Sequence, residues 1–363
     1  MSLHTVLCDL LECRYPVVQT AMGWVSDAGL VSATCNAGGF GFLAGATIPP
    51  ERLESEILRV KALTSRPFGL NIHMFQSNAA DAIELVLRHK LRAVSYGRGP
   101  DGATIARLKA GGVLCMPTVG AVKHAVRAVE LGADIITIQG AEGGGHTGQV
   151  PTTILLPQVL DAVSVPVVAA GGFFDGRGLA AALAFGAAGV AMGTRFLMTS
   201  DSPVPRAVLE RYLAADDPAA IRVSRAVDGL PQRLIDNAEL RRIEEMGVVQ
   251  RLTLGIRYGL DWSRRSGLGL AQTLAAAARM AFGDRLGFSA TVMAATAPVL
   301  IQRALSEGDP DGGLLPSGQV AALIDQLPSC AELLSDMIEE AVRCIDRLSA
   351  MNETADQGRK GTA

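Results

Sequence analysis

One histidine stands in a segment that is rich in glycine. Residues 139–149 read QGAEGGGHTGQ and place His146 directly after three consecutive glycines. Imidazole can give or accept a proton near neutral pH, and small neighbours let a ligand approach the backbone closely. Three other histidines fall at the chain start or on predicted helices, and His73, which follows a predicted strand, is a weaker second candidate. We therefore expect His146 to act as a general acid or base.

Two glycine-containing pairs follow consecutive apolar runs within residues 169–196. The first run ends in Gly171-Gly172 and the second in Gly193-Thr194. Backbone N–H groups at such strand ends can surround a phosphate, and the Thr194 hydroxyl adds another donor. Tight turns would explain either pair alone, but two such pairs on adjacent strand ends favour a phosphate site. A flavin mononucleotide (FMN), a sugar phosphate and a nucleotide all fit this pattern.

Other predicted strand ends carry residues that suit a flat ligand. Met22 and Gly23 follow the first strand, and the Met22 thioether can give a soft apolar contact. Asn71 ends the third strand, and its amide can both donate and accept hydrogen bonds, as the polar edge of a flavin requires. Gln139 ends the sixth strand. Together these residues are consistent with one extended ligand across the strand ends.

Short apolar runs alternate with longer amphipathic stretches over the first two hundred residues. This alternation is typical of βα units that build a parallel sheet. The predicted strands cover residues 16–19, 41–44, 68–71, 93–96, 113–118, 135–139, 167–170 and 189–192. The predicted helices between and after them cover residues 26–39, 50–64, 79–90, 102–111, 121–133, 153–163 and 176–187.

Eight strands, each followed by a helix or a loop, are the number that closes a (β/α)8 barrel. Ligands bind at the C-terminal strand ends of such a barrel, so His146 and the glycine pairs would share one mouth. An open doubly wound sheet is the alternative, but it normally shows G-x-G-x-x-G after its first strand, and MGWVSDAG after Gln19 does not match. We therefore predict the α/β class and a TIM barrel.

The pattern changes after Thr194. Residues near 200–290 are richer in Arg and Glu, and they contain helical stretches but no strand-like run. We interpret residues 215–290 as a smaller helical insert, a lid or substrate domain near the C-terminal face of the barrel. Residues 1–214 and 291–363 would form the cofactor-binding barrel with its closing helices. The predicted helices after Thr194 include residues 203–215, 237–249, 270–283, 292–305, 317–325 and 330–348.

Composition excludes several function classes. Of the 363 residues 49% are hydrophobic and 19% charged, which is enough for a large core, and the net charge of -3 argues against a nucleic-acid partner. The six cysteines are scattered without metal-type pairing, so we expect no metal site and a reducing compartment. No signal peptide or membrane span is evident, which predicts a cytoplasmic protein. A homodimer is compatible with the sequence, which does not define the oligomeric state.

The motifs occur in the order of a known family. PVVQTAMGWVSD, FGLNI, IQGAEGGGHTG, AAGGFFDGRG, GVAMGTRF and a late SGQ resemble the nitronate monooxygenase (2-nitropropane dioxygenase-like) family over nearly the whole chain. The resemblance implies an FMN-binding barrel with a helical second domain, and His146 over the flavin as catalytic acid or base. Carried over to this sequence, it implies that FMN contacts Met22, Gly23, Asn71, Gln139, Gly144, Gly172, Gly193, Thr194, Gly318 and Gln319.

One segment departs from the usual family pattern. Where typical members have Glu-Ala-Gly-Gly-His, this chain has Gly at the second position, Gly143. Residues 199–205, 227–233 and 317–330 are most similar to an actinobacterial branch of NAD-linked flavin oxidoreductases of steroid C- and D-ring (hydrindane-CoA) breakdown. That similarity implies an enone-like or acyl-CoA substrate with NAD(H) or NADP(H) as co-substrate. Arginines of the insert could then receive a CoA phosphate or carboxylate, namely Arg222, Arg225 and Arg233.

Other functions stay open from the residues. A nitronate monooxygenase would use His146 to deprotonate or orient a small alkyl nitronate before oxygen reacts. A non-redox barrel could use the same phosphate loops for another phosphorylated ligand. A dehydrogenase of the inosine-monophosphate type needs a nucleophilic cysteine after the sixth strand, and none lies between Gln139 and Thr153. A flavin carrier without catalysis is the remaining alternative.

Overall fold

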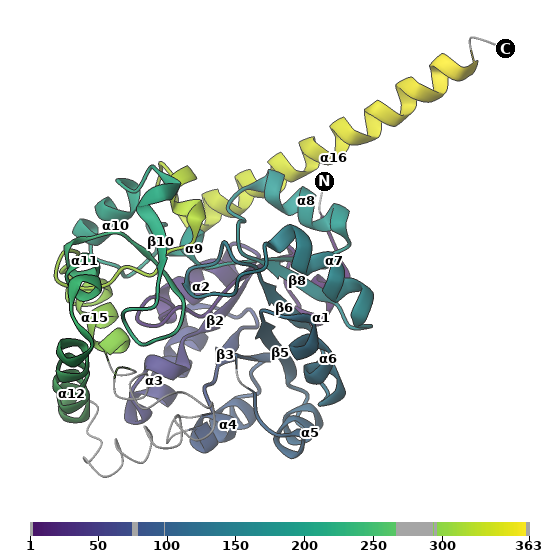
Figure 1. The fold of residues 1–363 in the computed structure, drawn as a ribbon. Coiled ribbons are helices and arrows are strands. Elements are labelled where there is room, and N and C mark those ends of the chain that lie inside the picture. Colours follow the sequence, from purple (N-terminus) through teal and green to yellow (C-terminus); the bar gives the residue numbers. More distant parts are fainter. Residues whose placement is uncertain (1–2, 75–78, 98, 266–292, 294–295, 361–363) are drawn as a thin grey trace.

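A closed barrel of parallel strands forms the centre of the molecule (Figure 1). The computed structural model describes residues 3–74, 79–97, 99–265, 293 and 296–360. Neighbouring strands follow the chain order and the last pairs with the first, which confirms the predicted TIM barrel. The strands are β1 (Val17–Gln19), β2 (Phe40–Leu43), β3 (Gly69–Asn71), β4 (Ala93–Tyr96), β5 (Leu114–Val119), β6 (Ile136–Gln139), β8 (Val167–Ala170) and β9 (Gly189–Met192).

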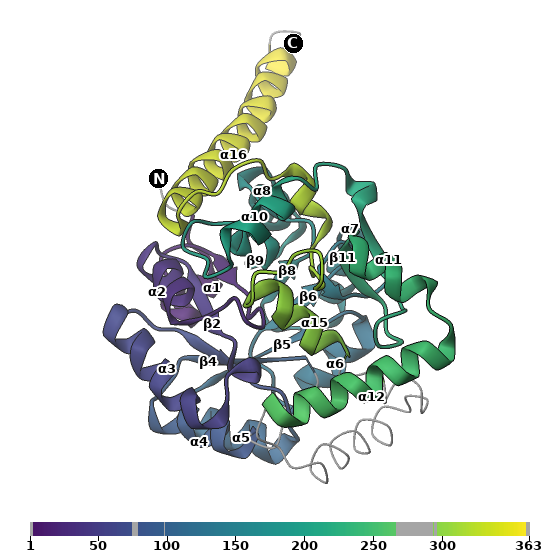
Figure 2. The same cartoon turned by 90° about the vertical axis from the view of Figure 1, so that its left-hand side faces the viewer.

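A ring of helices covers the outer face of the barrel (Figures 1 and 2). These helices are α2 (Ala28–Asn36), α3 (Pro50–Leu63), α4 (Ala79–Arg88), α5 (Gly102–Ala110), α6 (Val122–Glu130), α7 (Thr152–Ala162) and α8 (Gly176–Phe185). Each overlaps a helix predicted from the sequence. Strands such as β8 and β9 are buried at every position, because helices cover one face and the barrel interior covers the other.

Large side chains fill the barrel interior toward its N-terminal end. Phe40 and Phe42 of β2 point inward and meet edge to face, with ring centroids 5.1 Å apart. Leu7 and Leu11 of the short helix α1 (Val6–Leu11) pack into the same cluster. They fill the N-terminal end of the barrel interior, and ligands of such barrels bind at the C-terminal strand ends.

The insert contains strands that the sequence did not predict. β10 (Ile221–Ser224) and β11 (Gln232–Ile235) form an antiparallel hairpin, and β11 also pairs with β7 (Gly145–His146). The prediction that residues near 200–290 lack strands was therefore wrong. Each strand is only four residues long and contains an arginine, so the sequence gives little apolar signal there.

Helices complete the insert and the C-terminal part. α10 (Arg206–Leu213), α11 (Ala238–Glu245) and α12 (Val248–Arg265) precede α15 (Thr296–Leu305), which lies across the strand ends in Figure 2. The predicted helix at 270–283 lies outside the described residues. The predicted helix at 317–325 is instead a 3-10 turn, η3 (Gln319–Leu323). The division into a barrel and a lid domain at residues 215 and 290 stays a prediction.

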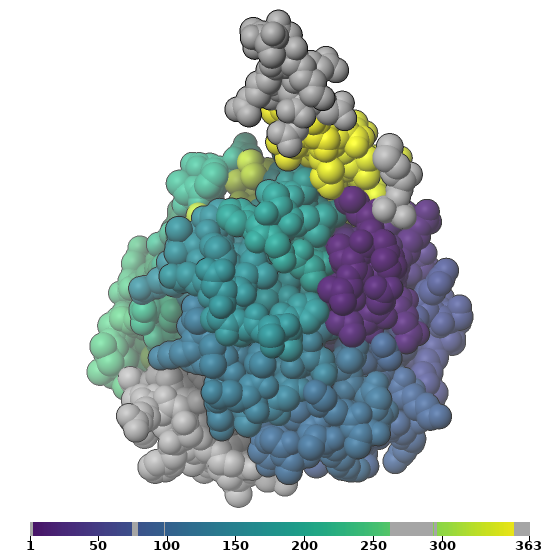
Figure 3. Space-filling view, turned by 90° about the vertical axis from the view of Figure 1, so that its right-hand side faces the viewer, coloured from purple at the N-terminus to yellow at the C-terminus, as the bar shows by residue number. Residues whose placement is uncertain are grey.

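The last helix, α16 (Cys330–Lys360), packs on α8 and α2 and then extends away from the barrel (Figure 1). Its buried positions, such as Leu334 and Met337, belong to the first half. In Figure 3 the N-terminal segment, in purple, lies directly beside the part of α16 drawn in yellow. The N-terminal segment and the start of α16 therefore lie on one side of the barrel.

We expect Gly176→Ala to destabilise the fold at the crossing of α8 and α16. A Cβ at this first residue of α8 would lie 2.5 Å from Ala341 N and still closer to Met337 O, so the helices would have to separate. We expect a loss of about 1–3 kcal/mol in the free energy of unfolding, measured by urea denaturation.

Gly102→Ala is the matched control. Gly102 also opens a helix after an aspartate cap, but its Cβ would make only an ordinary 3.7 Å contact with Leu131 Cδ2. Equal losses in the two variants would contradict the close helix crossing.

Two general features bear on the function. Among the described residues no helix combines the length and the apolar character needed to span a membrane. The six cysteines are free, and no cluster of three His, Cys, Asp or Glu side chains suited to a metal ion occurs in the described part of the chain.

Candidate active site

A cavity of about 600 Å³ opens at the C-terminal ends of the strands. Thr137 and Gln139 of β6, Ala170 of β8 and Ala191 of β9 contribute to its walls. Of the eleven residues predicted for catalysis and FMN contact, nine line it together: Met22, Gly23, Gln139, Gly144, His146, Gly172, Gly193, Thr194 and Gly318. The structure thus brings the predicted phosphate loops and the predicted histidine into one space.

Two predicted cofactor residues do not line this cavity. The Asn71 amide donates to both the backbone oxygen and the hydroxyl of Ser95, at 3.1 Å each. Gln319 follows Gly318, and its backbone N–H donates to Glu142 O at 3.0 Å. Asn71 therefore braces two neighbouring strands and Gln319 secures the glycine-rich loop, and their contact with a cofactor stays a prediction.

The cavity wall formed by the loops after β8 and β9 offers unused hydrogen-bond donors. In the described part of the chain, the backbone N–H groups of Gly172 and Gly193 have no protein acceptor. Thr194 Oγ1 accepts the N–H of Gly318 at 2.9 Å, so its own hydroxyl proton is free to point elsewhere. Three donors around one wall suit a phosphate group.

The loop that carries His146 is fixed from several directions. The Glu142 carboxylate accepts the backbone N–H and the hydroxyl of Thr152, at 3.1 and 2.8 Å. The Gln139 side chain donates to His146 O at 2.9 Å. Gly144 passes so close to the late segment that a Cβ would lie 2.6 Å from Gly318 N, so no larger residue fits there. Glu142 is thus a structural anchor of the loop.

His146 meets a buried carboxylate from the insert. Its Nε2 lies 2.8 Å from Asp228 Oδ2, and its side chain is 57% exposed whereas that of Asp228 is 7% exposed. The Gln232 amide also donates to this Oδ2 and stands opposite His146 in the pairing of β11 with β7. The ring is therefore held at one nitrogen and open to the cavity elsewhere.

Asp228 and Gln232 were not identified from the sequence. Both lie more than 80 residues from His146, in the segment VDGLPQR that carried only a family resemblance. Asp-Gly with a proline two residues later is a turn signal, which could have indicated the hairpin. An apolar wall was also missed, and it comes from α15 and η3: Pro298, Ile301, Leu305 and Val320.

The three arginines proposed as anion binders have different surroundings. Arg222 forms ion pairs with Asp236 and Glu244, at 2.9 and 2.6 Å. Arg233 is buried and donates to Ala141 O, and burial lowers the pKa of its guanidinium. Arg225 is exposed and, among the described residues, its side chain has no ion-pair partner. Arg225 is therefore the one of the three that is free to meet a ligand.

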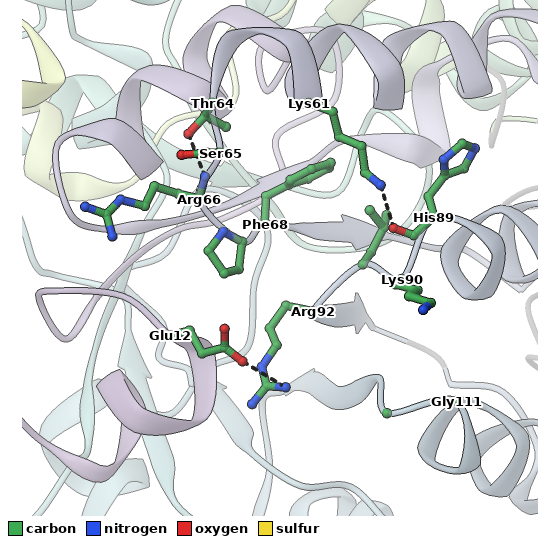
Figure 4. Close-up of a pocket in the computed structure, with 13 residues that line it drawn as sticks. Glu12, Lys61, Thr64, Ser65, Arg66, Phe68, His89, Lys90, Arg92 and Gly111 are labelled. Atoms are coloured by element: carbon green, nitrogen blue, oxygen red, sulfur yellow. Dashed lines mark hydrogen bonds and ion pairs between the residues drawn. The ribbon is translucent and has the colours of Figure 1, made fainter.

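A second cavity, of about 530 Å³, lies at the opposite end of the barrel (Figure 4). Its walls come from segments that precede β3, β4 and β5. Lys61 donates to His89 O at 2.7 Å, and Arg92 pairs with Glu12 at 3.2 Å. It contains none of the predicted site residues, and the N-terminal face of a barrel usually serves stability, so we do not assign the active site to it.

Comparison with known proteins identifies the family. A family model described as nitronate monooxygenase matches residues 4–94 and 78–340. The chain belongs to the nitronate monooxygenase family. It is therefore an oxidoreductase, and the resemblance seen in the motifs is confirmed.

Two relatives and one solved structure show how the similarity is distributed. A (3aS,4S,5R,7aS)-5-hydroxy-7a-methyl-1-oxo-octahydro-1H-indene-4-carboxyl-CoA dehydrogenase of Mycobacterium tuberculosis is 46% identical over 97% of this chain and 100% of its own. A probable nitronate monooxygenase of Staphylococcus saprophyticus is 30% identical over 68% of this chain and 82% of its own. The structure of FabK from Thermotoga maritima superposes with a TM-score of 0.79 and 28% identity, covering 96% and 100% of the two chains. The predicted similarity to the actinobacterial branch is confirmed.

Proposed function

We propose that this protein is an FMN-dependent, NAD(P)-linked oxidoreductase that acts on an enone-like or acyl-CoA substrate, such as a steroid-ring degradation intermediate. The observation that carries the proposal is the single cavity that joins the glycine loops of β8 and β9 to His146. The full-length similarity to a CoA-thioester dehydrogenase supports the substrate class.

The residues of the cavity fit FMN. The free N–H groups of Gly172 and Gly193 and the hydroxyl of Thr194 would hold the phosphate. Met22 and the small side chains of Ala170 and Ala191 leave an apolar floor for a flat ring. When bound, FMN supplies hydride transfer, while the protein supplies placement and proton handling.

Hydride transfer is accompanied by transfer of a proton, and a residue of this chain must donate or accept that proton. His146 is the only histidine on the glycine-rich loop, and its ring is exposed to the cavity. A general acid or base has to lie within hydrogen-bond reach of the substrate atom that gains or loses the proton. We assign this role to His146.

The cavity wall formed by α15 suits an apolar substrate that is attached to CoA, which is anionic. Pro298, Ile301 and Leu305 present a hydrophobic surface opposite the strand ends, where fused rings could lie out of water. Arg225 lies on the hairpin that also bears Asp228, and it is available to a CoA phosphate. A cytoplasmic location and a homodimer remain predictions.

Anaerobic reduction tests the redox partner. We expect NADH or NADPH to bleach the flavin absorbance of the purified holoenzyme, and an added hydrindane-type CoA ester to turn over. A holoenzyme that stays yellow with both nicotinamides would overturn the NAD(P) link. Purified protein that neither carries nor binds FMN would overturn the whole proposal.

A nitronate monooxygenase is the second candidate, because the family match and the staphylococcal relative favour it. Oxygen uptake with propionate-3-nitronate distinguishes the two functions. We expect little uptake, since the cavity wall contributed by α15 is built for a larger apolar group. Rapid uptake together with absence of turnover of CoA esters would favour the second candidate.

A further inference from the structure

We propose that Asp228 is a positioning residue that keeps the proton of neutral His146 on Nε2, which leaves Nδ1 as the nitrogen that exchanges a proton with the substrate. This inference rests on the proposed role of His146 as general acid or base. It adds a second residue, from a different part of the chain, and it specifies the reacting atom.

The Asp228 carboxylate is the acceptor of the hydrogen bonds that surround it. Oδ1 accepts the N–H of Leu230 at 3.0 Å, and Oδ2 accepts the amide of Gln232. His146 Nε2 is 2.8 Å from the same Oδ2, whereas the Gln232 amide nitrogen, which already donates to Oδ2, is farther from Nε2, at 3.2 Å. The shorter contact, with the carboxylate, therefore decides where the proton lies. An ionised carboxylate can only accept, so a stable contact at this distance needs a proton on Nε2. In neutral imidazole the other nitrogen then carries a lone pair.

The other ring nitrogen, Nδ1, has no protein partner in the described part of the chain. The His146 side chain lines the cavity. The Nε2 side, in contrast, meets a carboxylate with only 7% exposure. The arrangement gives one ring nitrogen a buried carboxylate partner and leaves the other nitrogen without a protein partner.

The insert holds Asp228 rigidly in this place. Gln232 stands in register with His146 across β11 and β7 and donates to the Asp228 carboxylate. The next residue, Arg233, donates to Ala141 O of the histidine loop through Nη2 at 2.9 Å. The hairpin is thus bonded to the histidine loop at more than one point, and a carboxylate held in this way fixes the ring and its tautomer.

Asp228→Asn tests the inference without relying on turnover. An asparagine has the same shape, but one of its two terminal atoms becomes a donor, and that donor favours a bare Nε2 with the proton moved to Nδ1. Two-bond ¹H–¹⁵N spectra of the ¹⁵N-histidine holoenzyme report the tautomer, with the His146 signals assigned by their loss in His146→Gln. We expect an Nε2–H ring in the wild type and an Nδ1–H ring in Asp228→Asn.

Kinetics provide the second readout. We expect kcat of Asp228→Asn to fall by about 10²–10⁴-fold with little change in KM, as expected when a base carries its proton on the wrong nitrogen. Asp228→Glu, which retains the carboxylate, should recover part of kcat. Asp236→Asn is the control, because it removes ion pairs with Arg222 and Arg241 at the end of the same hairpin without touching His146.

Several outcomes would overturn the inference. An Nδ1–H ring in the wild type, an unchanged tautomer in Asp228→Asn, or an equal loss of kcat in Asp236→Asn would each do so. If the enzyme proves to have no NAD(P)-linked activity, the proposed function fails, yet the spectra still decide whether Asp228 sets the tautomer.

Discussion

Replacing His146 by alanine is expected to lower turnover of the acyl-CoA substrate by about 10²–10⁴-fold while FMN stays bound. The reason is that the imidazole lines the cavity with one nitrogen free of protein partners, whereas the proposed phosphate donors lie on other loops. Stopped-flow measurement separates the two half-reactions. We expect flavin reduction by the nicotinamide to change little and the step with the CoA ester to slow.

His73→Ala is the informative control for this result. His73 also lines the cavity, but it follows β3 and lies outside the glycine-rich loop. A smaller fall in turnover for His73→Ala than for His146→Ala is expected. If His73→Ala proves as damaging, or if His146→Ala retains wild-type turnover, His146 loses its assignment as acid or base.

Adding one methyl group at Gly172 should weaken FMN binding at least about tenfold, which corresponds to about 1.4 kcal/mol. Gly172 has a φ of 86° and lines the cavity, and a Cβ there would still clear Glu142 by 3.7 Å. The methyl group therefore fits the protein but enters the space in which a phosphate would approach the backbone. Fluorescence titration of the apoprotein with FMN measures the effect.

Gly112→Ala separates this effect from backbone strain. Gly112 has a φ of 77°, a Cβ added to it would have no heavy atom within 4 Å, and it borders the cavity at the opposite end of the barrel. Both substitutions place alanine in the left-handed region, at a cost of about 1–2 kcal/mol in stability. Equal FMN affinity in the two variants would mean that the phosphate does not lie at Gly172.

The barrel was predictable because its signals are local. Each strand is an apolar run between amphipathic helices, and β8 and β9 are so thoroughly buried that their sequences, VVAA and GVAM, contain no polar residue. The cavity followed from the barrel, since the C-terminal ends of parallel strands converge. The order of strands and loops along the chain was therefore enough to place His146 and the glycines at one mouth.

The contribution of the insert was not predictable in the same way. β10 and β11 are four residues long. β11 includes Arg233, and a charged residue is not expected in a buried strand, so the sequence pattern does not indicate one. The role of Asp228 is evident only from its contact with His146, which lies 82 positions earlier in the sequence. Periodicity describes which face of an element is buried, but it does not say which distant loop supplies a partner.

The segment at Gly318 lies far after the barrel strands in the sequence, and this order affects how the cavity forms while the chain is synthesised on the ribosome. The last barrel strand ends at Met192, whereas the Ser317-Gly318 backbone that presses on Gly144 is translated 126 residues after it, counting from 192 to 318. At about 5–20 residues per second, that interval is roughly 6–25 s. During this time the growing chain has all the barrel strands but not the Ser317-Gly318 segment, so we expect a wider entrance to the cavity on the growing chain than on the finished protein.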